Sequence, residues 1–269
     1  MKTNLGTILW ESRDVINAIL SNDTQGSKIL IFGNGRSGST VLQQMFSPND
    51  NCLDLGELLT IRRSRHKACP QLKISQSICS DWEFINGQAN YHLKKNGINQ
   101  VCVHVKPMHV GTDQIADFLT KAQCHGWIII LLFRNISDIM VSAEKAKKTK
   151  IWHTNIDVRE NTAATNDLGF GEIKYRMLEG LRTRWSYNHC LTQWGNKEPH
   201  IRCDFNLNLI NEESQAKFAQ LIATTYPSIS IGLNRIKIKR NEPFQYQQKD
   251  LEVIEFLRKE EAKLNNPSV

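Results

Sequence analysis

Short apolar runs alternate with segments of helical periodicity along this 269-residue chain, and this alternation constrains the fold more than any other feature. Apolar runs at 28–32, 101–105, 127–133 and 200–203 predict strands. Helical patterns occupy 7–20, 39–46, 82–95, 112–122, 136–148, 171–194, 212–225 and 249–264. Buried strands that alternate with helices form a parallel sheet with helices on both faces. We therefore expect a single three-layer α/β domain over residues 1–269, with its central parallel β-sheet flanked by helices.

Composition narrows the class of protein. Hydrophobic residues make up 40% and charged residues 23%, which is typical of a globular protein and excludes intrinsic disorder as the main state. A net charge of +7 favours an anionic ligand such as a nucleotide, a nucleic acid, a phospholipid or a sulfated sugar. The longest apolar run, 127–133, is far shorter than the roughly 20 residues that span a bilayer.

The seven cysteines are scattered and form no C-x-x-C pair. This pattern predicts reduced thiols, with neither a disulfide framework nor a zinc site. The N-terminal residues do not resemble a signal peptide, so we expect a cytoplasmic protein. The oligomeric state is not visible in the sequence.

A glycine-rich segment, Gly33-Asn-Gly-Arg-Ser-Gly-Ser-Thr40, lies between a predicted strand and a predicted helix. It matches G-x-x-x-x-G-K-[ST] at Gly33, Gly38 and Thr40, but Ser39 stands where the lysine belongs. Glycines let backbone amides point at an anion, and a helix N-terminus favours negative charge. The segment predicts a phosphate site, although the missing lysine argues against ordinary ATP or GTP hydrolysis. The alternative is a glycine-rich turn without a ligand.

A second pattern follows the strand at 127–133. Arg134 leaves the end of this strand, and Ser142 lies about two helical turns further on. Ligands of parallel sheets bind beyond the carboxyl ends of the strands, so an arginine and a hydroxyl here could hold a second phosphate. The alternative is an ordinary surface or ion-paired arginine.

Together the two patterns resemble the sulfotransferase family that uses 3′-phosphoadenosine 5′-phosphosulfate (PAPS). The loop resembles the family's 5′-phosphosulfate loop. Arg134 and Ser142, with Asn135 and Asp138 between them, resemble its 3′-phosphate motif. A donor with two separate phosphates and no γ-phosphate explains both the two patterns and the missing lysine.

The resemblance implies a P-loop NTPase-like fold, with PAPS as co-substrate, its desulfated form PAP as product, and no metal. The implied nucleotide contacts are Gly35, Arg36, Ser37, Gly38, Ser39, Thr40, Arg134 and Ser142. The family's late basic loop implies further contacts from Lys239 and Arg240, within a basic segment at 233–246 that lacks the expected glycines.

The sequence leaves two candidates for the base that deprotonates the acceptor. Asp54-Leu-Gly-Glu-Leu58 resembles carbohydrate and tyrosylprotein sulfotransferases, which carry a glutamate base shortly after the 5′ loop, and this implies Glu57. The alternative role for Glu57 is a carboxylate favoured at a helix start. His109 is the second candidate base, ahead of His104, which alternates with apolar side chains in its strand. Lys106 is implied to neutralise the transferring group, and Arg36 to assist the leaving phosphate.

The acceptor is implied to carry a hydroxyl, as in a sugar, a glycolipid, a tyrosine or another metabolite. We expect the acceptor pocket to be formed by residues 57–85 and by a mobile loop at 149–170. One rival is a P-loop kinase or other NTP-dependent enzyme without the lysine, although the strand at 127–133 ends at Arg134 rather than at an acid. Another is a non-catalytic nucleotide-binding protein. A nucleic-acid partner is not expected, since the basic residues form no stripe with aromatic residues.

Overall fold

The computed structural model describes residues 25–68, 80–94, 97–149, 168–233 and 246–266. Within these residues the strands form one sheet of order β2-β3-β1-β4-β5, and every neighbouring pair is parallel. The strands are β1 (Ser27–Gly33), β2 (Cys52–Asp54), β3 (Gln100–Val105), β4 (Trp127–Phe133) and β5 (Ile201–Asp204). The predicted central parallel sheet is confirmed.

The central strands are apolar throughout because both of their faces are covered. In β1, Leu30 and Phe32 belong to one core, whereas Ile29 and Ile31 belong to the other. A strand that is buried on both sides reads as a continuous apolar run rather than as an alternating one. This explains why β1, β3 and β4 were visible in the sequence.

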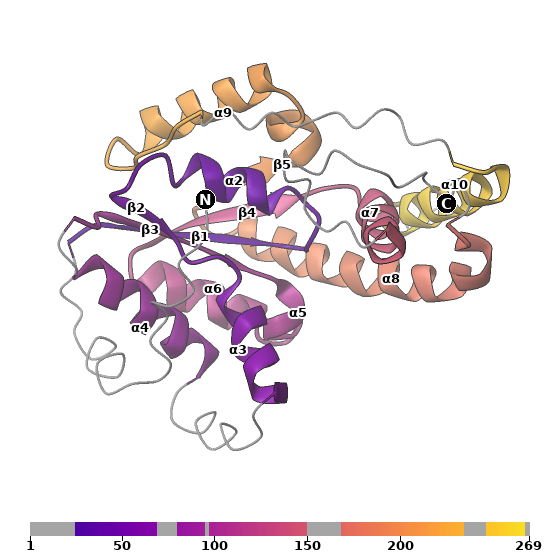
Figure 1. Ribbon diagram of the computed structural model, residues 1–269, viewed down its shortest axis with the longest axis horizontal. Helices are drawn as coiled ribbons and strands as arrows, with labels where there is room; N and C mark the ends of the chain where they lie inside the picture. The colour runs from indigo at the N-terminus through magenta and orange to yellow at the C-terminus, as the bar shows by residue number, and fades with distance from the viewer. Residues whose placement is uncertain (1–24, 69–79, 95–96, 150–167, 234–245, 267–269) are drawn as a thin grey trace.

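Helices cover both faces of the sheet, which confirms the three-layer arrangement (Figure 1). One face packs against α2 (Ser39–Met45), α9 (Glu212–Thr225) and the π-helical turn η3 (Phe205–Leu209). The other face packs against α3 (Leu58–Ala68), α4 (Asp81–Leu93), α6 (Ile115–Cys124) and the C-terminal half of α8 (Phe170–Gly195). The short helix α5 (Pro107–Val110) follows β3 directly.

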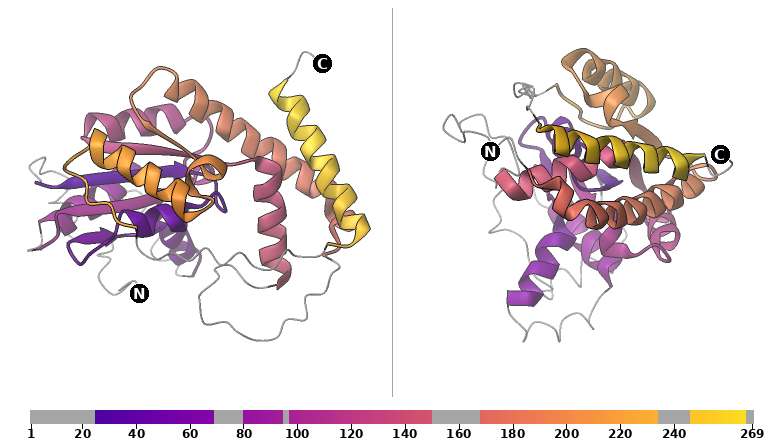
Figure 2. Two further views of the ribbon diagram at one scale, coloured as in Figure 1. Left: turned by 90° about the horizontal axis from the view of Figure 1, so that it is seen from above. Right: turned by 90° about the vertical axis from the view of Figure 1, so that its right-hand side faces the viewer.

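A third core lies beyond the sheet, where α7 (Ile136–Thr149), the N-terminal half of α8 and α10 (Gln248–Asn265) pack together (Figure 2). Met140, Leu181 and Leu257 are among its buried residues. Helix α8 belongs to two cores, since Leu181 lies in the third core and Leu191 in the core beneath the sheet. Among the described residues, no helix has both the length and the apolar character needed to cross a membrane.

The elements absent from the sequence predictions are short or polar. Strand β2 has three residues and pairs only with β3, and α3 reads LLTIRRSRHKA, with few apolar positions. The predicted helix at 112–122 begins later, at Ile115, after a turn at Gly111 with a φ of +91°. The predicted helix 7–20, and most of the predicted loops 149–170 and 233–246, lie outside the described residues.

Candidate functional site

The loops that follow the adjacent parallel strands β3, β1 and β4 all lie at the carboxyl ends of these strands. Strand β1 lies between β3 and β4, with Phe32 beside Val105 and Gly33 beside Leu132. Lys106 and Arg134 are the first residues after β3 and β4, so they flank the loop that leaves β1. Ligands of parallel sheets bind beyond these carboxyl ends.

The backbone of the loop at 33–38 requires glycine at two positions. A Cβ atom on Gly33 would lie 2.5 Å from the carbonyl oxygen of Leu132. Gly38 has a φ of +102°, and a Cβ atom there would lie 2.5 Å from the Phe205 ring. The loop can therefore approach β4 and η3 only because these residues have no side chain.

Side chains of the loop are also used to hold its shape. Asn34 is buried, and its Nδ2 donates a hydrogen bond of 2.9 Å to Oδ1 of Asn188 on α8. The fully buried Ser37 hydroxyl donates to the carbonyl oxygen of Asn34. Ser37 thus has its hydroxyl committed to the loop, which leaves only its amide for a ligand. Ser39 is buried at the start of α2, and Thr40 is exposed.

The two predicted phosphate motifs touch each other. Nε of Arg36 donates to Oγ of Ser142 at 3.1 Å, and Nη1 of Arg134 donates to the carbonyl oxygen of Arg36 at 2.9 Å. Arg36 has a φ of +68°, which is uncommon for a residue other than glycine. The hydrogen bond from Arg134 supports this conformation. The Arg134 guanidinium also lies 4.3 Å from the centre of the Phe205 ring.

The environment of Arg36 and Arg134 favours a bound anion. Burial lowers the pKa of both guanidinium groups; for Arg134, Asp138 raises it in part and Arg36 lowers it further. Asp138 itself pairs with Arg258 at 3.3 Å. Nε of Arg134 is buried and has no hydrogen-bond partner among the described residues. An anion would stabilise two neighbouring, partly desolvated positive charges.

Glu57 lies on the other side of the loop, in contact with three side chains. One carboxylate oxygen pairs with Nζ of Lys106 and accepts a hydrogen bond of 3.0 Å from the Thr60 hydroxyl. The other lies 3.4 Å from Nδ1 of His104, whose Nε2 is 3.1 Å from the carbonyl oxygen of Gly33. Burial alone would raise the pKa of Glu57, but hydrogen bonds and charges from His104 and Lys106 outweigh it. They hold this pKa well below its ordinary value.

Lys106 connects Glu57 with the loop. Its Cε atom lies 3.2 Å from where a Cβ of Gly35 would be. The side chain therefore passes directly over Gly35, and its amine reaches the Glu57 carboxylate.

His109, the second candidate base, belongs to the same cluster. Its Nε2 lies 3.4 Å from the Thr60 hydroxyl, which in turn donates to Glu57. Burial, together with the charges of Lys106 and Arg63, lowers the pKa of His109 to about 4, although Glu57 and Asp81 partly oppose this shift. His109 is thus neutral near pH 7, and Thr60 lies between the two candidate bases.

Several residues of this cluster were not predicted as site residues. Thr60 follows Glu57 by one helical turn, and His104 interrupts an apolar strand, so each left a weak signal in the sequence. Nothing in the sequence indicated Asn188 or Phe205 as site residues, because only the packing of α8 and η3 brings them to the loop. Lys239 and Arg240 lie outside the described residues, so their predicted contact stays a prediction.

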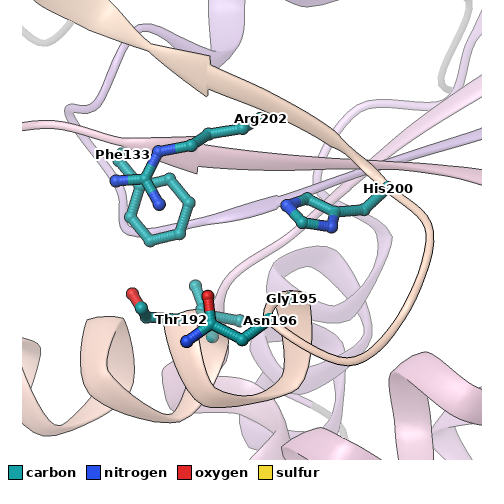
Figure 3. A pocket seen from close by; sticks show the side chains of 7 residues that line it. Phe133, Thr192, Gly195, Asn196, His200 and Arg202 are labelled. Carbon is teal, nitrogen blue, oxygen red and sulfur yellow. The ribbon is translucent and has the colours of Figure 1, made fainter.

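A cavity of about 230 Å³ lies elsewhere, between the C-terminal end of α8 and strands β4 and β5 (Figure 3). Its lining includes Phe133, His200 and Arg202, and the Arg202 guanidinium lies 4.2 Å from the centre of the Phe133 ring. None of the predicted site residues lines it. In the part of the chain that the structure describes, no group of three or more His, Cys, Asp or Glu side chains is placed to hold a metal ion.

No model of a known protein family matches the chain, and no curated protein matches its sequence. The resemblance to PAPS-dependent sulfotransferases therefore rests on the sequence motifs of this chain alone.

Proposed function

We propose that this protein is a sulfotransferase that moves the sulfuryl group of PAPS to a hydroxyl of an acceptor. The contact of Arg36 with both Ser142 and Arg134 carries this proposal. It joins the two phosphate motifs into one cationic site. That site shares the loop at 33–38 with the Glu57–Lys106 pair.

The charges around the loop favour a donor that binds without magnesium. Lys106 and Arg134 follow the strands on either side of β1, where a magnesium-dependent P-loop enzyme would carry a carboxylate that helps to hold the metal. Arg134 and Ser142 suit the 3′-phosphate, and Arg36 suits the separate 5′-phosphate. The amides of Gly35 to Thr40 suit the phosphosulfate. Lys239 and Arg240 remain proposed contacts of the 3′-phosphate.

The proposed reaction is an in-line substitution at sulfur. A bond forms between the acceptor oxygen and sulfur while the bond from sulfur to the 5′-phosphate oxygen breaks. The proton of the acceptor hydroxyl passes to the base, and the electron pair of the broken bond stays on the leaving phosphate of PAP. Arg36 and the loop amides stabilise that charge, and fixed positioning lowers the barrier further.

Glu57 is the proposed base, and His104 and Lys106 together set its strength. A carboxylate with a pKa far below its ordinary value accepts a proton poorly. An anion bound over Gly35 competes with Glu57 for Lys106, and loss of that ion pair raises the pKa of Glu57. His109 remains the alternative base, through its proximity to Thr60. The acceptor is a sugar, glycolipid or other hydroxyl-bearing metabolite, and the proposed location is the cytoplasm.

Thermal unfolding with PAP, AMP and ATP, each with and without Mg²⁺, tests the proposal. A ligand that binds only the native state raises the melting temperature according to its affinity. At saturating PAP we expect a rise of about 5–10 °C without Mg²⁺, and little change with AMP. Stabilisation by Mg-ATP alone would overturn the proposal in favour of a kinase.

Two variants and a matched control locate the binding. Arg36→Ala and Arg134→Ala should each lose most of the stabilisation by PAP. Arg202→Ala should keep it, because Arg202 lies over Phe133 in the separate cavity. Unchanged PAP binding in both of the first two variants would contradict the proposed site.

A further inference from the structure

Helix α10 carries one carboxylate near each end of its buried face. Val253, Ile254 and Leu257 pack into the third core. Asp250 and Glu261 lie about three helical turns apart on either side of these residues. Neither carboxylate belongs to the cluster around the loop.

Both carboxylates bind backbone amides at the beginning of a neighbouring helix. Glu261 accepts hydrogen bonds from the amides of Ile136 at 2.7 Å and Ser137 at 2.9 Å, in the first turn of α7. Asp250 accepts from Leu168 at 2.8 Å and Phe170 at 2.9 Å, where α8 begins. The first amides of a helix have no acceptor within the helix, and negative charge is favoured there. Helix α10 therefore caps both α7 and α8.

Both capped helices carry a residue that contacts the loop at 33–38. Helix α7 carries Ser142, which accepts from Arg36, and it begins at Ile136, two residues after Arg134. Helix α8 carries Asn188, which accepts from Asn34. A second contact, between Arg258 and Asp138 at 3.3 Å, joins α10 to the first turn of α7.

We propose that Glu261 is a positioning residue of the donor site, an inference that rests on the proposed function. By fixing the first turn of α7, it sets where Arg134 and Ser142 lie relative to Arg36. Because Glu261 already occupies the amides of Ile136 and Ser137, the 3′-phosphate is bound by side chains and not by this helix terminus.

The test compares two ligands that differ only in the 3′-phosphate. Calorimetric titration of the full chain with PAP and with AMP gives two dissociation constants, and their ratio measures the contribution of the 3′-phosphate. In Glu261→Ala we expect PAP affinity to fall about fivefold to tenfold, with AMP affinity nearly unchanged. Glu261→Gln should lie between this variant and the wild type, since its amide offers one acceptor oxygen instead of two.

Glu255→Ala is the matched control. Glu255 lies on the same helix, is exposed and pairs only with Lys259 among the described residues, at 2.8 Å, so its removal should leave the ratio unchanged. An unchanged ratio in both Glu261 variants, or an equal loss of PAP and AMP affinity, would overturn the inference. A wild-type protein that does not prefer PAP to AMP would instead overturn the proposed function. Glu261→Gln keeps the test available if the alanine variant does not fold.

Discussion

Arg36 and Arg134 are 98 positions apart in the sequence, yet one guanidinium donates to the backbone of the other residue. This contact gives Arg134 two roles. It supports a backbone conformation at Arg36 that a residue other than glycine rarely adopts, and it adds a second positive charge beside the first. A substitution at Arg134 is thus expected to affect both the shape of the loop and its attraction for anions.

At Glu57, loss of the charge should separate binding from turnover. Glu57→Gln removes the proposed base and frees Lys106 but keeps the loop, so PAP should raise the melting temperature at least as much as in the wild type. We expect the turnover of PAPS to PAP, measured with a mixture of hydroxyl-bearing acceptors, to fall about 10²–10⁴-fold.

Glu213→Gln serves as a control for this variant, because Glu213 is exposed and pairs with Lys217 far from the loop in sequence. Full turnover in Glu57→Gln would assign the base to His109. A variant at that position, His109→Asn, would then be the inactive one.

At the scale of elements, the loop at 33–38 and η3 are packed in direct contact. Gly38→Ala places a methyl group against Phe205 and also forces alanine into a positive φ. We expect the free energy of unfolding, measured in urea, to fall by about 3 kcal/mol. PAP binding should weaken as well, because Phe205 lies beneath Arg134.

Gly97→Ala separates the two causes of this loss. Gly97 has a φ of +92°, but nothing lies within 4 Å of a Cβ atom there. Its substitution should cost only the backbone strain of about 1 kcal/mol. Equal losses in the two glycine variants would show that contact with η3 contributes nothing.

At the scale of the whole molecule, α8 should couple the third core to the sheet. Its N-terminal half contributes Leu181 to one core and its C-terminal half contributes Leu191 to the other. The single domain therefore remains our prediction, and scanning calorimetry should show one unfolding transition. Two separate transitions would contradict it.

Leu257→Ala tests the same coupling. Leu257 is fully buried in the third core, so its truncation should lower the free energy of unfolding by about 3 kcal/mol and move the whole transition. Leu251→Ala on the same helix should change it by less than about 0.5 kcal/mol, because Leu251 is 44% exposed.

Local patterns in the sequence predicted most of the elements. The runs that became β1, β3 and β4 are apolar because both faces are buried, and the glycines at 33 and 38 mark a loop that a side chain would block. Strand β2 and helix α3 escaped prediction because one is three residues long and the other is mostly polar. Their form depends on a neighbouring strand and on packing, which no local pattern records.

By itself, the sequence determined the parallel α/β fold and the positions of Gly33 to Thr40, Glu57, Lys106, Arg134 and Ser142 along the chain. Only the tertiary structure decided that Arg36 meets Ser142, that His104 and Thr60 join Glu57, and that Glu261 caps α7. The physical reason is the distance along the chain over which each kind of interaction acts. Periodicity and turn chemistry act over a few residues, whereas these contacts join residues that only the strand order and the packing of α7, α8 and α10 bring together.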